Sequence, residues 1–294
     1  MRIIPYLLDG LSPLDHMSIE NVLLETWEQP EGLLLFYING PSVIIGRNQN
    51  PWREAAPGTG LPLYRRASGG GAVYHDEGNL NWALIVPRLL HSQDAELAMV
   101  AAALSAQGVD AVPGPRGGLY CGPTSPHQNK KLSGTARRFG TRNVLHHGTL
   151  LIHADMARLH ASLGGIHTFD DLSLPSVPAT PLNLSTLDSS LKIEPLIDAL
   201  SRHIAGAPAQ RLPAAFAEPM RMEKETTRLA SDEWIYYATA PFSVLLKGDE
   251  TAVSIRVEKG RIAAISAGGG DGSYLGRPFS FSLHEAMIEK IRSR

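Results

Sequence analysis

The chain contains a single cysteine, Cys121, among its 294 residues, so no internal disulfide can form. Such a composition suits a reducing compartment. The first residues are interrupted by Pro5 and Asp9, which is a poor pattern for a secretory signal peptide. No apolar run approaches the roughly 20 residues that a membrane span requires. We therefore expect a cytoplasmic protein without a membrane partner.

A strong excess of one charge is also absent, because 27 Lys and Arg residues and 29 Asp and Glu residues give a formal net charge of −2. This balance provides no bulk attraction to nucleic acid, so we expect no nucleic-acid partner and only local anion binding. The GxxxxGK[ST] phosphate loop and the GxSxG nucleophile elbow are missing as well. A nucleotide, if one is used, must be bound in another way.

The hydrophobic patterns predict an α+β protein. Strands are expected at 2–8, 33–38, 42–45, 80–86 and 143–153, helices at 12–27, 95–107, 156–163 and 193–204, and a long loop at 168–190. Asn39-Gly40-Pro41 predicts a turn from which 42–45 returns as the second strand of a hairpin. Further along the chain, short strands are expected at 234–238, 242–246, 252–257 and 261–266, before a helix at 282–291. We therefore expect a main domain over 1–217 and a small α+β domain over 218–294.

Residues 63–87 place two arginines, a serine and three consecutive glycines between apolar segments. Adjacent glycines lose much backbone entropy on folding, and the usual compensation is close approach of the backbone to a ligand, with N–H groups free to bind an anion. The alternative is an ordinary glycine hairpin between two core strands. The neighbouring Arg65, Arg66 and Ser68 favour the anion site.

Two further segments carry cations beside flexible backbone. Arg47 follows a predicted strand and is flanked by amides, which suits either an anion clamp or a polar loop. Lys130 and Lys131 precede Ser133-Gly134, small residues that let the backbone approach a ligand. Adjacent lysines are more often a solvated pair, so both interpretations stay open here.

Three other residues invite a chemical role that their context does not favour. His146 and His147 are neighbours on a predicted strand, so their side chains point to opposite faces and a zinc site is not expected. Cys121 lies in an irregular segment with no orienting base nearby, which favours an incidental thiol over a nucleophile.

Four blocks together resemble the bacterial lipoate–protein ligases. They are Gly46–Trp52 (GRNQNPW), Arg65–Asn79 (RRASGGGAVYHDEGN), Lys131–Ala136 (KLSGTA) and His146–Asp155 (HHGTLLIHAD). The resemblance covers about residues 1–204, and the segment from Trp234 resembles a shortened form of the family's C-terminal accessory domain. It implies a biotin/lipoyl ligase-like catalytic domain, with mixed sheets flanked by helices, and a small α+β accessory domain.

The resemblance also implies a reaction in two steps. Lipoate or octanoate reacts with ATP and Mg²⁺ to give an enzyme-bound acyl-adenylate, such as lipoyl-AMP, and pyrophosphate. The acyl group then passes to one lysine of a lipoyl domain or glycine-cleavage H-like protein, and the enzyme is expected to be a monomer. Attack of a carboxylate on a phosphate needs cations and N–H donors at the site. Lys131 is therefore expected to be catalytic, whereas the ligands of Mg²⁺ are not specified.

The family pattern places further residues at the substrates. They are Arg47, Arg65, Ser68, Gly69, Gly70, Gly71, Ala72, Val73, His75, Asn79, Ser133, Gly134, Ala136, His147 and Gly148. Among these, Arg65, Ser68 and His75 are expected at the acyl and phosphate end, and Asn79 and Ala136 near the nucleotide. One departure is Arg116-Gly117-Gly118-Leu119, which stands where the family usually has Arg-Asn-Asp-Leu.

Two other functions remain open. An ATP-independent octanoyltransferase of the same fold would work through a cysteine thioester, for which Cys121 is the only candidate. A non-catalytic lipoate-binding module is a third hypothesis, against which the lysine and the glycines argue. A requirement for ATP and the effect of Cys121→Ser distinguish the two enzymes. The sequence specifies neither the acceptor nor the choice between lipoate and octanoate.

Overall fold

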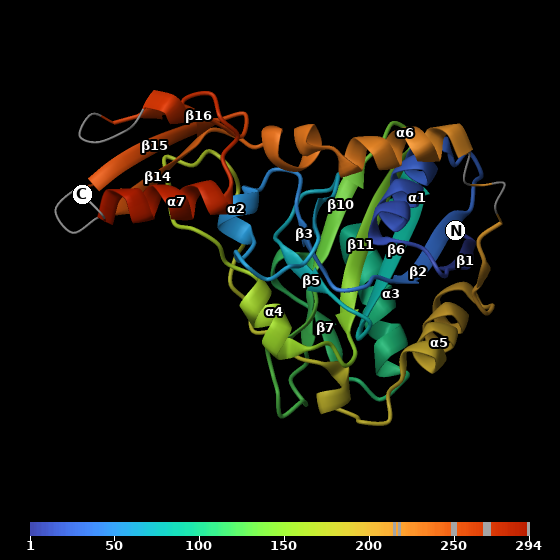
Figure 1. Cartoon of the computed structure of the whole chain (residues 1–294). Coiled ribbons are helices and arrows are strands. Elements are labelled where there is room, and N and C mark those ends of the chain that lie inside the picture. The colour runs from blue at the N-terminus through green and yellow to red at the C-terminus, as the bar shows by residue number, and fades with distance from the viewer. Residues whose placement is uncertain (214–215, 217–218, 248–251, 267–271, 293–294) are drawn as a thin grey trace.

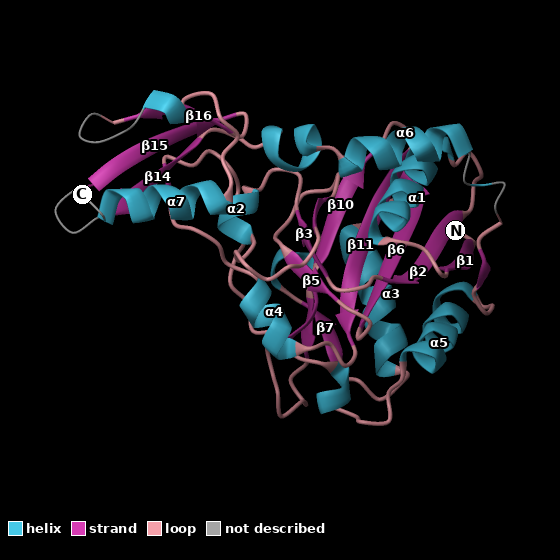
Figure 2. Ribbon diagram, viewed as in Figure 1, coloured by secondary structure: helices cyan, strands magenta, loops and turns pink. Residues whose placement is uncertain are grey.

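The computed structural model describes residues 1–213, 216, 219–247, 252–266 and 272–292. A larger body contains a six-stranded sheet, and a smaller body contains the C-terminal strands and the last helix (Figure 1). Helices flank the sheets of both bodies (Figure 2). The predicted α+β class with mixed sheets is confirmed. Within the described residues, no helix is both long enough and apolar enough to cross a membrane.

The bounds of the elements are as follows. The strands are β1 (Ile3–Leu8), β2 (Gly32–Ile38), β3 (Ser42–Ile45), β4 (Leu63–Arg65), β5 (Val73–His75), β6 (Asn79–Pro87), β7 (Ala111–Pro113), β8 (Leu119–Cys121), β9 (Lys131–Ser133), β10 (Thr135–Phe139), β11 (Asn143–Leu151), β12 (Thr168–Phe169), β13 (Gln210–Arg211), β14 (Phe242–Lys247), β15 (Ala252–Glu258) and β16 (Arg261–Ile265). The helices are α1 (Pro13–Thr26), α2 (Pro51–Glu54), α3 (Gln93–Ser105), α4 (Met156–Ser162), α5 (Ile193–Ala205), α6 (Pro219–Ala230) and α7 (Phe281–Arg292). Single turns form at η1 (Arg88–Leu90), η2 (Pro115–Gly117), η3 (Leu184–Thr186), η5 (Glu233–Tyr237) and η6 (Gly272–Tyr274).

The six-stranded sheet has the order β10-β11-β6-β2-β1-β13 and is covered on both faces. Along β2, Leu33 and Leu35 pack against α1, whereas Leu34 and Phe36 pack in the cluster formed with α3 and α5. This alternation follows from the two-residue period of a strand. Helix α1 begins at a capping box, in which Ser12 Oγ accepts a hydrogen bond from the Asp15 N–H at 3.2 Å. The sheet and α1 thus form a rigid support for side chains near their ends.

The glycine segment belongs to a separate three-stranded sheet with the order β4-β3-β5. Strand β3 pairs in parallel with β4 and antiparallel with β5, so the loop at 66–72 crosses from one side of β3 to the other. The alternative of an ordinary hairpin is therefore wrong, because β4 and β5 are not neighbours. The predicted hairpin of 33–38 with 42–45 is also wrong, since β2 pairs with β1 and β6 instead.

The smaller body is built on the sheet β12-β14-β15-β16, against which α7 packs. Strand β12 comes from the segment predicted to be loop, and Trp52 of α2 lies in the same apolar cluster as Phe242 and Phe279. The predicted strand at 234–238 is wrong, because Glu233–Tyr237 forms a π-helical turn. The predicted boundary between 217 and 218 lies outside the described residues. Through α2 and β12, the larger body contacts the C-terminal strands.

Candidate active site

The loop at 66–72, called the glycine loop here, is held by the buried side chain of Arg66. Its guanidinium donates to Ser68 Oγ at 3.0 Å, to the carbonyl oxygen of Gly69 at 3.1 Å, to that of Gly71 at 2.8 Å and to that of Ile44 at 3.2 Å. Burial lowers the pKa of Arg66 to about 10, so the side chain remains a cation at neutral pH. The loop carbonyls are thereby fixed around a positive charge.

The backbone of this loop needs glycine at Gly70, where φ is +86°. A Cβ added there would lie 2.9 Å from Arg66 Nη2, and one added at Gly46 would overlap the Gly70 carbonyl oxygen. By contrast, a Cβ at Gly69 would meet no atom within 4 Å, so open space adjoins the loop at that point. In the described part of the chain, the N–H groups of Gly69, Gly70 and Gly71 donate to no other residue. They are available to an anion or an oxyanion.

Ser68 begins a chain of hydrogen bonds that leads into the core. Its Oγ lies 2.7 Å from His147 Nε2, and His147 Nδ1 lies 2.9 Å from Glu20 Oε2. Tyr37 Oη donates to Glu20 Oε1 at 2.7 Å. Burial, followed by the nearby Glu20 charge, raises the pKa of Tyr37 well above its usual range, which keeps the phenol a donor. Glu20 comes from α1, His147 from β11 and Ser68 from the glycine loop, so three separate elements assemble this chain.

Lys131 provides a cation whose ammonium has no partner among the described residues. A Cβ built at Gly134 would lie 3.6 Å from Lys131 Nζ, which places the ammonium over that glycine. Arg116, at the turn η2, is also unpartnered within the described residues. Burial, and then the positive charge of Arg116, lower the pKa of Lys131. Two cations that lie near each other without a neutralising partner favour the binding of an anion.

The segment that carries Lys131 also borders the glycine loop. A Cβ at Gly70 would lie 3.4 Å from the Ala136 Cβ and 3.7 Å from the Thr135 carbonyl oxygen. In the sheet, Ala136 is opposite His147 and Thr135 is opposite Gly148. The blocks that begin at Lys131 and His146 therefore meet at the glycine loop, as their resemblance to the ligase family predicts.

Arg65, which was expected at the phosphate end, is fully occupied by the protein. Its guanidinium donates to the carbonyl oxygens of Arg47, Gln49 and Ile235 and to Thr239 Oγ1, at 2.6 to 3.0 Å. These bonds use all five N–H donors that an arginine has. The indole of Trp234 donates in return to the Arg65 carbonyl oxygen at 2.7 Å. Arg65 therefore fastens the π-helical turn to the glycine loop.

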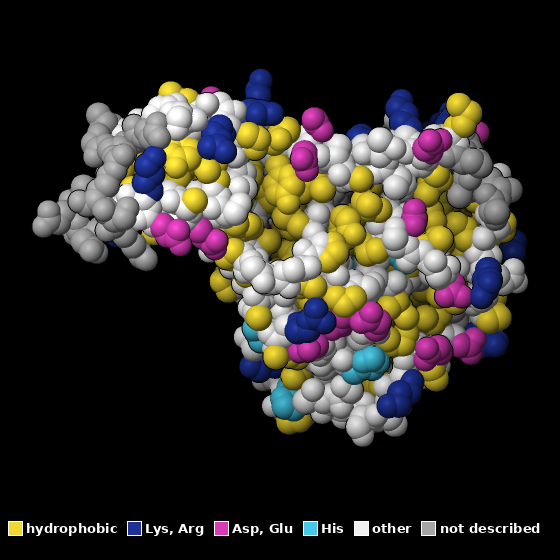
Figure 3. Space-filling model, viewed as in Figure 1, with side chains coloured by type: hydrophobic (Ala, Val, Ile, Leu, Met, Phe, Trp, Pro, Cys, Tyr) yellow, Lys and Arg dark blue, Asp and Glu magenta, His cyan; other side chains and the backbone are white. Residues whose placement is uncertain are grey.

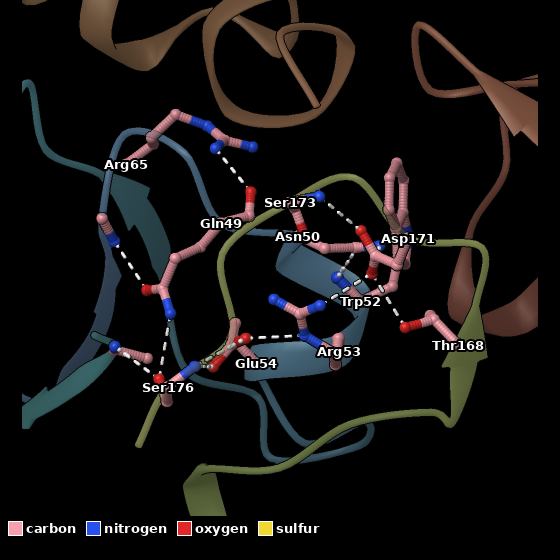
Figure 4. A network of polar contacts seen from close by, with 12 residues as sticks. Gln49, Asn50, Trp52, Arg53, Glu54, Arg65, Thr168, Asp171, Ser173 and Ser176 are labelled. Carbon is pink, nitrogen blue, oxygen red and sulfur yellow. Dashed lines mark hydrogen bonds and ion pairs between the residues drawn. The ribbon is translucent and has the colours of Figure 1, made fainter. Parts of the chain in front are cut away.

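A segment from the predicted long loop contacts the end of the glycine loop through Ser176, whose network with Gln49 and Glu54 is seen in Figure 4. Ser176 Oγ accepts hydrogen bonds from the Ala72 N–H and from Gln49 Nε2, both at 2.9 Å. The Ser176 N–H donates to the Glu54 carboxylate at 3.3 Å. Arg53 and Asp171 form an ion pair of 2.9 Å in the same network. This segment, together with Gln49, fixes the end of the glycine loop that leads into β5.

The remaining expected residues have mixed surroundings. The side chain of Arg47 is exposed, and its N–H donates to the Ser68 carbonyl oxygen at 2.9 Å. His75 is buried, bonded through Nδ1 to Asn39 at 2.8 Å, and its Nε2 has no partner within the described residues. Burial, with the charges of Arg66, His147 and His16, lowers the pKa of His75 to about 3. This imidazole is therefore neutral.

Asn79 and Ser133 each leave a buried oxygen, Oδ1 and Oγ respectively, without a hydrogen bond in the described structure. Val73 and Ala72 pack against apolar clusters that include Ile44 and Ile45, so they contribute to the core beneath the loop.

Cys121 is buried in the main core, with 1% of its surface exposed. Burial raises the pKa of its thiol, which keeps it protonated. Across the described ranges, no group of three or more His, Cys, Asp or Glu side chains is placed to hold a metal ion. Side chains of both charges are mixed over the face seen in Figure 3, in keeping with the small net charge.

Glu20, Arg66, Arg116 and Ser176 are parts of the site that the predicted residue set lacks. Arg66 lies within a recognised block, and Arg116 lies in the segment that departs from the family pattern. Both positions could have indicated a role at the site. Glu20 has a weaker signal, a carboxylate among the apolar residues Ile19, Val22 and Leu23 of a predicted helix. Ser176 has none, because its segment shows no periodicity.

On a fold of mixed sheets, the free N–H groups of the glycine loop and the unpartnered cations Lys131 and Arg116 form a candidate anion-binding site. The chain belongs to the lipoate–protein ligase family, since the model for the lipoyl protein ligase A/B catalytic domain matches residues 12–205. It is an enzyme of the lipoate ligase and transferase family.

Known proteins similar to this chain include both ligases and a transferase. The mitochondrial lipoyl amidotransferase LIPT1 of Mus musculus is 32% identical over 253 residues, which cover 80% of this chain and 66% of that protein, slightly under two thirds. The crystal structure of P. falciparum LipL1 in complex with lipoate is 20% identical with a TM-score of 0.69, covering 99% of this chain and 98% of that one. A lipoate–protein ligase A bound with ATP is 24% identical with a TM-score of 0.63, covering 79% and 98%. At these identities the two structures share the fold.

Proposed function

We propose that this protein activates lipoate or octanoate with ATP as an acyl-adenylate and transfers the acyl group to a lysine of a lipoyl-domain or H-protein-like acceptor. The observation that carries the proposal is the pair of unpartnered cations, Lys131 and Arg116, on the segments that border the free N–H groups of the glycine loop. Arg116 and Gly70 are exposed and Lys131 is half-buried, so these donors are open to an anion from solvent. The two similar structures, one with lipoate and one with ATP, agree with this pair of substrates.

In the first step, the acyl carboxylate attacks the α-phosphate of ATP and pyrophosphate leaves. In this proposal the Lys131 ammonium offsets the charge that accumulates at phosphorus, and the N–H groups of Gly69 to Gly71 bind phosphate or carboxylate oxygens. In the second step, the acceptor amine attacks the acyl carbonyl and AMP leaves. The described residues offer no cluster to hold Mg²⁺, so we derive no step through a protein-bound metal.

The test is to supply the full chain with lipoate, MgATP and a lipoyl domain, and to follow pyrophosphate release and the mass of the acceptor. The proposal requires an acceptor heavier by one lipoyl group, and no modification when ATP is omitted. A parallel reaction with octanoate gives the acyl preference.

A second function, lipoyl transfer from one protein to another without ATP, is favoured by a specific observation. The chain Ser68–His147–Glu20 provides a hydroxyl with a base and a carboxylate behind it, which adenylation does not require. The similar mouse protein is named a lipoyl amidotransferase. Replacing lipoate and ATP with a lipoylated donor domain tests this function directly.

The acceptor, the cellular site and the oligomeric state are part of the same proposal. We expect a small lipoyl domain as acceptor, a monomeric enzyme and a cytoplasmic location. The mouse relative is named as mitochondrial, so localisation of the tagged full chain decides the last of these.

A further inference from the structure

We propose that Ser68 is a nucleophile that carries the acyl group as an ester between an amide donor and the acceptor lysine. This inference rests on the second function proposed above, and it names the residue that would perform the exchange. It requires a polarised hydroxyl, a base, a stabiliser for the oxyanion and the lack of a better nucleophile. The described structure provides each of these.

The hydrogen bonds define the direction of proton transfer. A carboxylate only accepts, so in the form of His147 that can act as a base the ring hydrogen lies on Nδ1, 2.9 Å from Glu20 Oε2. Its Nε2 is then an acceptor for the Ser68 hydroxyl at 2.7 Å. Arg66 Nε donates to the same Oγ at 3.0 Å, which orients the hydroxyl and favours its alkoxide form. Ser68 Oγ thus has one hydrogen-bond donor, Arg66, and one base, His147.

The loop that follows Ser68 suits the developing oxyanion. The N–H groups of Gly69 to Gly71 are unpartnered in the described residues, and their carbonyls are held by Arg66. Backbone N–H groups next to a nucleophile stabilise a tetrahedral intermediate. Open space at the Cβ position of Gly69 leaves room beside the nucleophile, while Ser68 itself is only 2% exposed, which shields an ester from water.

The step balances without a further reactant. Ser68 Oγ attacks the carbonyl carbon of a lipoyl-lysine amide, and His147 Nε2 takes the hydroxyl proton. As the C–N bond breaks, that proton passes to the departing lysine nitrogen, leaving an acyl ester on Oγ. The lysine amine of the acceptor then attacks the ester, a C–N bond forms, and its proton returns to Ser68 through His147. Donor and acceptor exchange one acyl group, and no ATP is consumed.

The cysteine cannot take this role in the described structure. No histidine or carboxylate is hydrogen-bonded to the Cys121 thiol in the described residues, the thiol lies in the main core cluster with Val109 and Leu119, and burial raises its pKa. Lys131 lacks a base within hydrogen-bonding distance. Ser68 is the group with the geometry of an activated nucleophile.

The test is to mix the full chain with a lipoylated lipoyl domain, without ATP and without a second acceptor, and to quench in acid. Intact mass should show the protein heavier by one lipoyl group, and peptide mapping should place the group on Ser68. Ser68→Ala should give no adduct, whereas Ser68→Cys should give a thioester that neutral hydroxylamine removes. The matched control is Ser201→Ala, since Ser201 is a fully buried serine bonded to the Ala207 carbonyl oxygen in another part of the fold.

Initial rates with donor and acceptor domains both varied should show ping-pong kinetics, and His147→Gln should lower acylation by about 10²–10⁴-fold. Glu20 acts as a positioning residue, so Glu20→Gln should change the pH profile of acylation as well as its rate. An adduct on another residue, or full exchange by Ser68→Ala, would overturn the proposal. ATP-driven ligation is run in parallel: if it proceeds while exchange and adduct are absent, the acyl-serine and the ATP-independent transfer are both overturned and the ATP-dependent function stands. If neither reaction modifies the acceptor, the proposed function is lost as well.

Discussion

Hydrogen bonding separates the cations of the site into two groups. The guanidinium groups of Arg65 and Arg66 are surrounded by backbone oxygens and hydroxyls, so their charge stabilises the shape of the loop. The ammonium of Lys131 and the guanidinium of Arg116 have no such partners within the described residues. Lys131 is half-buried and its pKa is shifted, and ionisable groups of this kind are found at functional sites more often than elsewhere, whereas the unpaired Arg116 is exposed to solvent. This contrast is the reason to expect chemistry at Lys131.

Replacing Lys131 with alanine should therefore remove adenylation and leave the fold intact. Loss of one charge-stabilising group typically lowers a rate by about 10²–10³-fold. The measurement is pyrophosphate release with lipoate and ATP, with circular dichroism to check the fold. Lys130→Ala is the matched control, because the neighbouring lysine contributes no group to the site described above. Equal activity of the two variants would show that the role belongs elsewhere.

The same lysine should set the alkaline limit of the reaction. Burial, followed by the charge of Arg116, lowers the pKa of Lys131, so the ammonium loses its proton at a lower pH than an ordinary lysine. Adenylation depends on the charged form and should therefore fall as the pH rises through that lowered value. Lys131→Arg, whose side chain stays protonated, should remain active to higher pH at a lower maximal rate. A pH profile unaffected by this substitution would contradict the assignment.

His75 should make the protein sensitive to acid. Its pKa is lowered from 6.5 to about 3 in the native state, so the unfolded chain binds a proton that the native chain excludes. Stability is therefore fully present above pH 6.5 and is lost as the pH falls toward 3, at about 1.4 kcal/mol per pH unit. His75→Asn keeps an acceptor for Asn39. In this variant the free energy of unfolding, measured in urea, should change less with pH between pH 6 and pH 4 than in the wild-type protein. The exposed His153, changed to Asn, is the control; an identical slope in both variants would refute the prediction.

Among the elements, the glycine loop contains consecutive glycines that look equivalent in the sequence but differ in how strictly the structure requires glycine. Gly70 needs its positive φ and has Arg66 Nη2 2.9 Å from the position of a Cβ, whereas Gly69 has neither restriction. Gly70→Ala should destabilise the fold by about 1–2 kcal/mol, and Gly69→Ala by far less. The melting temperatures of the two variants give the comparison, with roughly 2–4 °C expected per kcal/mol. A similar loss in both would mean that the loop adopts another conformation.

The recognised blocks predicted the family, because four blocks in the family's order are far more specific than any one of them alone. Pairing partners could not be predicted in the same way. The composition of β3 indicates a strand, but it does not indicate the partners of that strand. Strand β3 pairs with β4 and β5 rather than with β2, which depends on how these strands are arranged in space. The residues Glu233–Tyr237 have β-propensity, and hydrogen bonds from Arg65 to Ile235 override it.

The partners within the site show the same limit. Glu20 lies 127 positions before His147, and no local pattern indicates that their side chains meet. Ser176 lies 104 positions after Ala72, in a segment without periodicity, and its role comes only from the hydrogen bonds it makes. Such contacts depend on the tertiary arrangement, which a single sequence does not specify.

For the whole molecule, the question is how the C-terminal part is joined to the catalytic fold. Helix α6 packs on α1, where Leu229 is fully buried in a cluster with Met17 and Ile44. Asn21 Nδ2 donates to Glu225 at 2.8 Å across the same interface. Further along the chain, the Ile235 carbonyl oxygen of the π-helical turn accepts two hydrogen bonds from the guanidinium of Arg65. Residues 219–239 thus pack on the larger body, and the strands β14, β15 and β16, which join β12 in the small sheet, follow them.

Two truncations follow from this packing. A chain ending at Pro219 removes α6 and the turn, which exposes the apolar side of α1 and leaves the buried guanidinium of Arg65 without three of its five hydrogen bonds. Unpaired buried charge is strongly destabilising, so this chain should aggregate or melt well below the full protein. A chain ending at Ala240 retains both elements and loses β14, β15, β16 and α7, which uncovers Trp52 and leaves β12 without its partner strand. With Trp52→Gln added to limit aggregation, it should stay folded.

The comparison is made by melting temperature and by lipoate binding for residues 1–219, residues 1–240 and the full chain. The shorter chain should fail in both measurements, while the longer one should bind lipoate. Its adenylate should hydrolyse faster than that of the full chain if the C-terminal sheet closes over the site, since closure excludes water from a reactive anhydride. A stable chain of residues 1–219 would restore the boundary near residue 217 and would mean that α6 belongs to the accessory domain after all.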